Sequence, residues 1–208
     1  RRPSAGGPPL VLILPGSRGQ EIEGNLASLL RAALLVQAHV PGARFAIAAL
    51  HERHAEKIRS AANGCPGFRD LGAEIVAGRT RGLIAGATAA LAVSGSVSLE
   101  LLAARVPTVI VYRISGLAYV VQSFFRHARF ITLVNLLAVR EPILPVRPTL
   151  VPPREVPPSD PEAVYPEFLA VQDPAERAAG HVAEWLLDPA ARARTVLRLE
   201  SVAREVAV

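Results

Sequence analysis

An unbroken apolar run that ends abruptly in a turn is the feature that most restricts the fold of this chain. Leu10–Leu14 contains no polar residue, and Pro, Gly, Ser and Arg follow it before an amphipathic segment begins. Such a run is typical of a strand buried on both faces, as in a parallel sheet, and the turn indicates a helix N-terminus. Gly16 permits close backbone approach, Ser17 (with Gln20 three residues on) is placed to cap the helix, and Arg18 offers a cation that fits phosphate. A plain strand–turn–helix corner accounts for the same residues without any ligand.

The same rhythm recurs along the chain and predicts alternating strands and helices. Besides 10–14, we expect strands at 44–50, 73–77, 89–93, 107–112 and 130–133. We expect helices at 21–40, 51–62, 80–87, 173–187 and 189–206, and a further helix that ends at 104. Strands that alternate with helices form βαβ units, so the predicted fold is α/β with a doubly wound, Rossmann-like parallel sheet. Ligands of such sheets bind at the carboxyl ends of the strands.

A second turn follows the strand at 89–93 and is expected at the same edge of the sheet as the first. Ser94, Gly95 and Ser96 can donate hydrogen bonds to a diphosphate. Glu100 lies four residues after Ser96 on one helix face, where its carboxylate can accept bonds from the hydroxyls of a ribose. A capped helix with an acid in its first turn explains these residues equally well, so both interpretations stay open on the pattern alone.

Composition narrows the class of protein. Half of the residues are hydrophobic, which indicates a globular chain, and no apolar run reaches the ~18 residues of a membrane span. A single cysteine, Cys65, excludes an intrachain disulfide and fits a reducing compartment. No Cys and His cluster predicts a metal. The net charge of +5 favours phosphates or anionic surfaces, but no basic or aromatic-interleaved patch predicts nucleic acid as a partner.

Three segments lie outside the regular rhythm. Residues 1–9 are rich in Pro, Gly and Arg and are expected to be a linker, ahead of a Rossmann-like domain at 10–188. Within that domain, 139–166 is a proline-rich insertion. The helix expected at 189–208 has one apolar stripe, formed by Leu199, Val202, Ala203 and Val206. Because the chain contains no Met, we expect it to be part of a longer protein, and we expect this stripe to be exposed and to dock on an absent N-terminal domain.

An aromatic and apolar stretch at 114–125 lies between basic residues. It predicts either a core helix with a charged end or a surface that contacts an anionic membrane. The membrane hypothesis rests on Leu117, Tyr119, Val120, Phe124 and Phe125 beside Arg113, Arg126 and Arg129.

Taken in order, the motifs resemble one family, the bacterial lipid-A-disaccharide synthases, which are glycosyltransferases of the two-Rossmann-domain (GT-B) type. The matching segments are Leu14–Arg18 with Glu21-Ile22, Ser94-Gly95-Ser96 with Leu99-Glu100, Pro107–Arg113, Leu133–Ala138 and Pro166–Leu169. The resemblance covers nearly the whole chain, and the first two segments at this separation carry most of it.

The resemblance implies a function and a set of site residues. The family transfers a 2,3-diacylglucosamine unit from UDP-diacylglucosamine to lipid X and releases UDP, in the cytoplasm at the inner face of the cytoplasmic membrane. This chain is similar to the C-terminal half, which holds the UDP donor. The catalytic base is expected on the N-terminal half, and no cofactor or metal is implied. The implied donor contacts are Gly16, Ser17, Arg18, Glu21, Ser94, Gly95, Ser96, Glu100, Asn135 and Glu167.

Two other functions stay open. An isomerase of the same architecture, such as a UDP-N-acetylglucosamine 2-epimerase, shares a UDP site but needs catalytic acids and a His in the cleft, and the His residues here lie outside the motif loops. A non-catalytic nucleotide-binding module is the third possibility. On its own, this chain is expected to bind UDP weakly and to be inactive.

Overall fold

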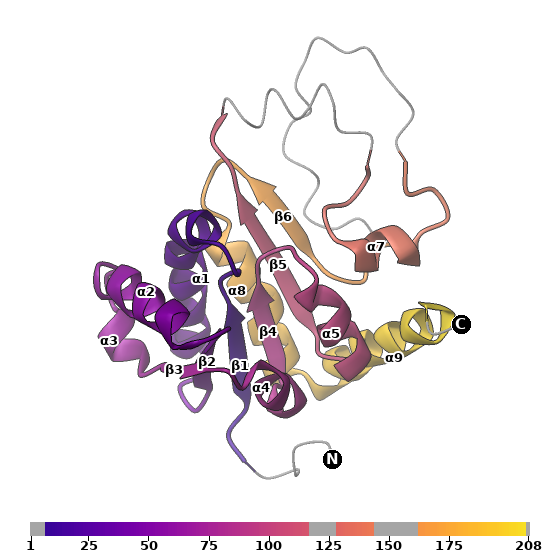
Figure 1. Ribbon diagram of the computed structural model, residues 1–208. Helices are drawn as coiled ribbons and strands as arrows, with labels where there is room; N and C mark the ends of the chain where they lie inside the picture. Colours follow the sequence, from indigo (N-terminus) through magenta and orange to yellow (C-terminus); the bar gives the residue numbers. More distant parts are fainter. Residues whose placement is uncertain (1–6, 117–127, 144–161, 207–208) are drawn as a thin grey trace.

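A six-stranded parallel sheet with helices on both faces forms the centre of the molecule (Figure 1). The computed structural model describes residues 7–116, 128–143 and 162–206. The strands are β1 (Leu10–Leu14), β2 (Arg44–Ala49), β3 (Glu74–Ala77), β4 (Ala89–Ala92), β5 (Thr108–Arg113) and β6 (Glu167–Ala170). The helices are α1 (Gly19–His39), α2 (Glu52–Asn63), α3 (Phe68–Leu71), α4 (Thr80–Gly86), α5 (Val97–Ala104), α7 (Leu133–Ala138), α8 (Ala175–Leu187) and α9 (Pro189–Val206).

The strand β1 is buried on both faces, which confirms the interpretation of its apolar run. Successive side chains of a strand point to opposite faces. Val11 and Ile13 therefore join the core that also contains side chains of α1, α2, α3 and α8. Leu12 and Leu14 join the core on the other face, with side chains of α4, α5, α7 and α9. The α/β, doubly wound fold predicted from the sequence is thus confirmed.

The order of the strands places two loops side by side. The strand order in the sheet is β3-β2-β1-β4-β5-β6. The strands β2 and β3 lie on one side of β1, and β4, β5 and β6 lie on its other side. Leu14 pairs with Ala92 across this junction, and the N–H of Val93 donates to the carbonyl of Leu14 at 2.9 Å. The loops that leave β1 and β4 therefore start from hydrogen-bonded neighbours, at the switch point where open α/β sheets bind ligands.

The prediction of a strand at 130–133 is wrong. The helix α7 begins at Leu133, and the side chain of Thr132 accepts a hydrogen bond from the N–H of Asn135 as an N-cap. The β-branched and aromatic residues of 130–133 resemble a strand locally, but the cap starts a helix instead. The sixth strand is β6, which pairs in parallel with β5 and aligns Glu167 with Ile110.

The proline-rich insertion at 139–166 returns into the core at its end. Residues 144–161 lie outside the described part of the chain. Val164 and Tyr165, just before β6, are buried in the core on the face covered by α5, α7 and α9. The last residues of this segment are therefore part of the domain's packing.

The apolar stripe of the last helix is largely covered, so the expectation that it is exposed is wrong. Leu199 is 0% exposed and Val202 is buried beside it, while Val206 at the end of α9 is exposed. The helix packs against α5, α7 and α8 of the same chain (Figure 1). An ion pair between Arg105 and Glu200, with Nε and Oε1 3.4 Å apart, joins α9 to the end of α5. Docking of this helix on a further domain remains a prediction.

Within the described ranges, no helix combines the length and the apolarity that a bilayer-spanning helix requires.

The packing of α9 gives a direct test. Replacing Leu199 with Ala should lower the free energy of unfolding by about 2–5 kcal/mol, because it leaves a cavity in a closed core. Leu197→Ala on the same helix is the matched control, because Leu197 is 62% exposed and its loss should cost less than about 0.5 kcal/mol. Urea denaturation followed by circular dichroism measures both. Similar small effects for the two variants would mean that α9 does not dock as described.

Candidate functional site

The loop between β1 and α1 requires glycine at position 16. Gly16 has a φ of +102°, a conformation that side-chain-bearing residues rarely adopt. A Cβ at this position would lie 2.6 Å from Oε2 and 2.7 Å from Cβ of Glu21. The turn and the first turn of α1 are therefore packed against each other with no space for a side chain.

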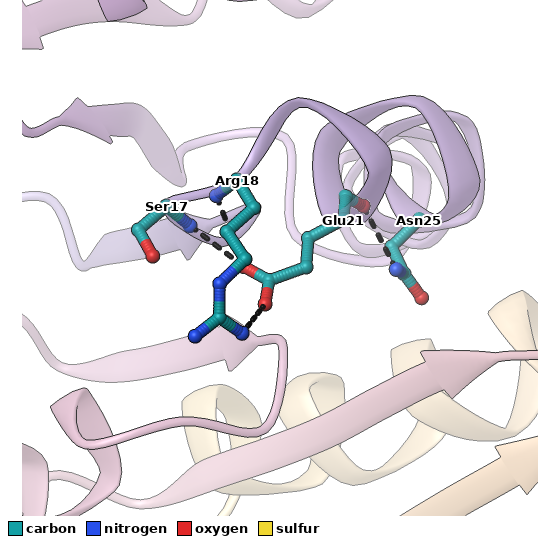
Figure 2. Close-up of polar contacts among 4 residues, drawn as sticks. All are labelled: Ser17, Arg18, Glu21 and Asn25. Carbon is teal, nitrogen blue, oxygen red and sulfur yellow. Dashed lines mark hydrogen bonds and ion pairs between the residues drawn. The ribbon is translucent and has the colours of Figure 1, made fainter.

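The carboxylate of Glu21 organises this loop (Figure 2). Its Oε2 accepts hydrogen bonds from the N–H groups of Ser17 at 2.9 Å and Arg18 at 3.2 Å. Its Oε1 accepts from Nη1 of Arg18 at 3.1 Å. The N-cap residue of α1 is Arg18, so the prediction that Ser17 caps the helix is wrong. An ionised carboxylate in the first turn is a stronger acceptor than a hydroxyl, and here it reaches back over the helix start.

These contacts set the protonation of Glu21. Partial burial alone raises the pKa of its carboxyl, but the two backbone donors and the Arg18 guanidinium outweigh that effect and lower the pKa below its ordinary value. The stabilisation that the carboxylate provides is therefore present above the ordinary pKa and is lost as the pH falls through the lowered one.

Asn25 connects the start of α1 to the end of β5. The sequence analysis did not identify this residue. It is 2% exposed. Its Nδ2 donates to the carbonyl of Glu21 at 2.8 Å (Figure 2), and its Oδ1 accepts from the N–H of Arg113, at the end of β5, at 2.7 Å. The available signal was an amide on the apolar face of α1, three residues after the buried Ile22.

The loop after β4 forms the second part of the site. Ser94 donates its hydroxyl hydrogen to the carbonyl of Ile131 at 2.9 Å. Gly95 and Ser96 are exposed at the start of α5, and the carboxylate of Glu100 is partly exposed, with Oε2 3.7 Å from Nε of Arg81. The structure thus brings this loop and the loop after β1 to the same edge of the sheet, as the sequence predicted.

Glu167 lies in a buried polar cluster with residues of the α7 segment. Its carboxylate accepts bonds from the N–H groups of Ile131 at 2.7 Å and Thr132 at 3.0 Å, from the hydroxyl of Thr132 and from Nδ2 of Asn135 at 2.8 Å. Burial raises the pKa of the Glu167 carboxyl, and these donors oppose the shift. Neither Ile131 nor Thr132 was expected to take part.

Asn135 is fully buried, and the structure uses all of its hydrogen-bonding positions. Its oxygen accepts from the N–H groups of Val164 at 2.8 Å and Tyr165 at 2.9 Å. Its amide donates to the carbonyl of Tyr165 at 2.7 Å and to Glu167 at 2.8 Å. The expectation that Asn135 lines the cleft is therefore not met, because its amide is consumed in joining α7 to the segment before β6.

The predicted residues fall into two connected groups. Gly16, Ser17, Arg18 and Glu21 form the loop after β1, next to the loop after β4. The hydrogen bond from Ser94 to Ile131 links the β4 loop to the cluster around Glu167. In the part of the chain that the structure describes, no three His, Cys, Asp or Glu side chains gather as metal ligands.

Most of the residues predicted to contact a membrane, Leu117, Tyr119, Val120, Phe124, Phe125 and Arg126, lie outside the described residues. Arg129 is described. Its Nη1 lies 2.6 Å from Oε2 of Glu162, and its guanidinium stacks over the ring of Phe130 at 5.3 Å from the centroid. The charge of Arg129 is therefore engaged within the chain.

Comparison with known proteins places these features in context. The family model described as lipid-A-disaccharide synthetase matches residues 7–146. The lipid-A-disaccharide synthase of Thiobacillus denitrificans is 30% identical over 198 residues, which cover 95% of this chain and 46% of that protein. The enzyme of the same name from Pseudomonas fluorescens is 37% identical over 134 residues, which cover 64% of this chain and 34% of that protein. The chain thus spans less than half of the length of these relatives.

Solved structures share the fold at low sequence identity. WaaG, described as a glycosyltransferase involved in lipopolysaccharide biosynthesis, superposes with a TM-score of 0.54 at 11% identity, over 96% of this chain and 43% of that one. An O-GlcNAc transferase mutant of Thermobaculum terrenum gives a TM-score of 0.50 at 16% identity, over 99% of this chain and 34% of that one. The arrangement of strands and helices is therefore one that glycosyltransferases use.

The geometry of the β1 loop predicts opposite effects for two glycine substitutions. Gly16→Ala should lower the free energy of unfolding by about 1–3 kcal/mol, because alanine is strained at this φ and its Cβ meets Glu21. Gly24→Ala, inside α1 with nothing within 4 Å of the added Cβ, should raise it by about 0.5–1 kcal/mol. Thermal and urea denaturation measure both, and a Gly16→Ala variant as stable as the parent would contradict the described loop.

Proposed function

Because the chain belongs to the lipid-A-disaccharide synthetase family, we propose that it provides the binding site for the UDP-linked donor of that reaction. In the whole protein, the reaction transfers a 2,3-diacylglucosamine unit from UDP-diacylglucosamine to lipid X and releases UDP. The observation that carries the proposal is the adjacency of two strand–loop–helix corners on the hydrogen-bonded strands β1 and β4. Arg18 lies in the loop after β1, and Glu100 lies in the first turn of α5, directly after the β4 loop. This is the switch point at which sheets of this order bind nucleotides.

The two loops offer complementary chemistry to a nucleoside diphosphate. The guanidinium of Arg18 is exposed and can form paired hydrogen bonds with phosphate oxygens. Glu100 is only loosely paired with Arg81, so its carboxylate is available to the hydroxyls of the ribose. As UDP leaves, negative charge develops on its diphosphate, and a fixed cation and backbone donors stabilise that charge in the transition state.

The cluster around Glu167 supports the site from behind, and the Asn135 side chain in it does not contact the donor. Its bonds hold Ile131 next to Ser94, and so fix the wall beside the β4 loop. We propose that Asn135 and Glu167 contribute by positioning this wall, because the donors and acceptors described for them are already paired within the chain.

The remaining parts of the reaction are assigned outside this chain. Activation of an acceptor hydroxyl requires a general base, and the described site offers no group with that role. We propose that the base and the lipid X site lie on an N-terminal domain, which fits the share of the relatives' length that this chain spans. The chain alone is then expected to bind the nucleotide and to be inactive.

We also propose that the protein acts as a peripheral protein at the inner face of the cytoplasmic membrane. Both the diacylated donor and the lipid acceptor of the reaction are lipids. The aromatic stretch that follows Arg113 combines apolar side chains with the cation Arg126, a combination that favours an anionic lipid surface.

Calorimetric titration of the chain with UDP tests the donor site. We expect saturable binding that Arg18→Ala and Glu100→Ala each weaken by about 1–3 kcal/mol, the effect of removing a charged hydrogen-bonding partner. Arg44→Ala and Glu74→Ala make the same changes of charge at the opposite edge of the sheet, at the starts of β2 and β3, and should leave the affinity unchanged. Equal effects at the two edges would argue against a specific site.

Sedimentation with vesicles that contain phosphatidylglycerol tests the membrane contact. Replacing Phe124 and Phe125 with Ser should reduce the bound fraction, because burial of the rings contributes to interfacial binding. Leu50→Ser is the control, since Leu50 is also an exposed apolar residue but directly follows β2, away from residues 114–125 in the sequence. Unchanged vesicle binding by the double Phe variant would count against this surface.

A further inference from the structure

We propose that Glu21 and Asn25 are positioning residues that hold the β1 loop in shape for a diphosphate, and that the contact with the phosphate is made by Arg18. This inference rests on the proposed function. It differs from the expectation that Glu21 itself contacts the donor, and it gives Asn25 a part in the site.

The loop's own N–H donors are already paired within the chain. The N–H groups of Ser17 and Arg18 both donate to Oε2 of Glu21. They are therefore not available to a phosphate, and they hold the Glu21 carboxylate in place. The side chain of Glu21 also fills the space beside Gly16, where even a methyl group would overlap with it. The loop is therefore folded around an internal carboxylate before any ligand binds.

Other hydrogen-bond donors of the β1 loop and of the first turn of α1 stay available to a ligand. Arg18 is 83% exposed and uses Nη1 for its ion pair with Glu21. A guanidinium carries five N–H donors, so its outer edge can still pair with phosphate oxygens. The N–H groups of Gly19 and Gln20, in the first turn of α1, have no acceptor within the helix. The contact with Glu21 thus keeps the cation next to the first turn of α1.

The β1 loop and the first turn of α1 are anchored to the sheet through Asn25. Asn25 is almost fully buried and bonds to the carbonyl of Glu21 on one side and to the N–H of Arg113 on the other. These two bonds connect the first turn of α1 with the end of β5, on the far side of the switch point. A loop held in this way loses less conformational freedom on binding, which favours affinity for the phosphate specifically.

The test compares two ligands that differ by the diphosphate. Calorimetry gives the affinities of the chain for UDP and for uridine, and their ratio measures what the phosphates contribute. We expect Glu21→Gln and Asn25→Ala each to lower this ratio about tenfold and to leave the affinity for uridine unchanged. Glu23→Gln is the matched control, because Glu23 is exposed on the same turn of α1, and it should leave the ratio unchanged.

A double-mutant cycle separates positioning from general stability. If Glu21 acts through Arg18, then Glu21→Gln should have no further effect on the ratio in an Arg18→Gln background. A rise of the ratio in Glu21→Gln would overturn the proposal, because it would show that the carboxylate competes with the phosphate. An equal loss of uridine affinity, or an unchanged ratio, would overturn it as well. If the parent chain binds neither ligand, the proposed function fails, and this inference fails with it.

Discussion

The burial of β1 on both faces is the constraint from which the rest of the structure follows. Every residue from Val11 to Leu14 is buried, so apolar layers must cover the strand above and below. Helices supply those layers, and parallel strands can be joined only by connections that cross over the sheet. With β1 in the centre, the chain first adds strands on one side and then on the other. That reversal creates the switch point at which the loops after β1 and β4 leave neighbouring strands.

The two sides of this switch point use the same device to fix their loops. Glu21 accepts the N–H groups of the β1 loop, and Glu167 accepts those of the segment that leads into α7. Buried or partly buried N–H groups without partners are costly, and a carboxylate with several donors satisfies them together. The loops are therefore held in shape by internal carboxyl groups, while most of the Arg18 side chain stays exposed. This preorganisation fits the donor site that we propose.

Predictions from local patterns succeeded where neighbours in the sequence determine the outcome. The strand at 10–14, the helix after it and the turn at Gly16 follow from hydrophobic period and turn chemistry within about a dozen residues. Local reasoning failed at 130–133, where a strand-like composition precedes a capped helix. It also failed at the stripe of α9, because the surface that covers Leu199 belongs to α5 and α7, which no pattern within α9 can identify.

The sequence by itself determined the class of fold, the family and the two loops at which we propose that the donor binds, because these follow from short segments and from their order along the chain. Only the tertiary structure decided which polar groups remain free for a ligand. Asn25 bonds to Arg113, which lies 88 residues further along the chain. Glu167 bonds to Thr132, which lies 35 residues before it. Hydrogen bonds of this kind depend on the order of strands in the sheet, so their partners become defined only when the whole sheet has formed. That is why Arg18 and Glu100 stay exposed at this edge of the sheet, whereas the side chains of Asn135 and Glu167 are bonded to each other and to their neighbours within the chain.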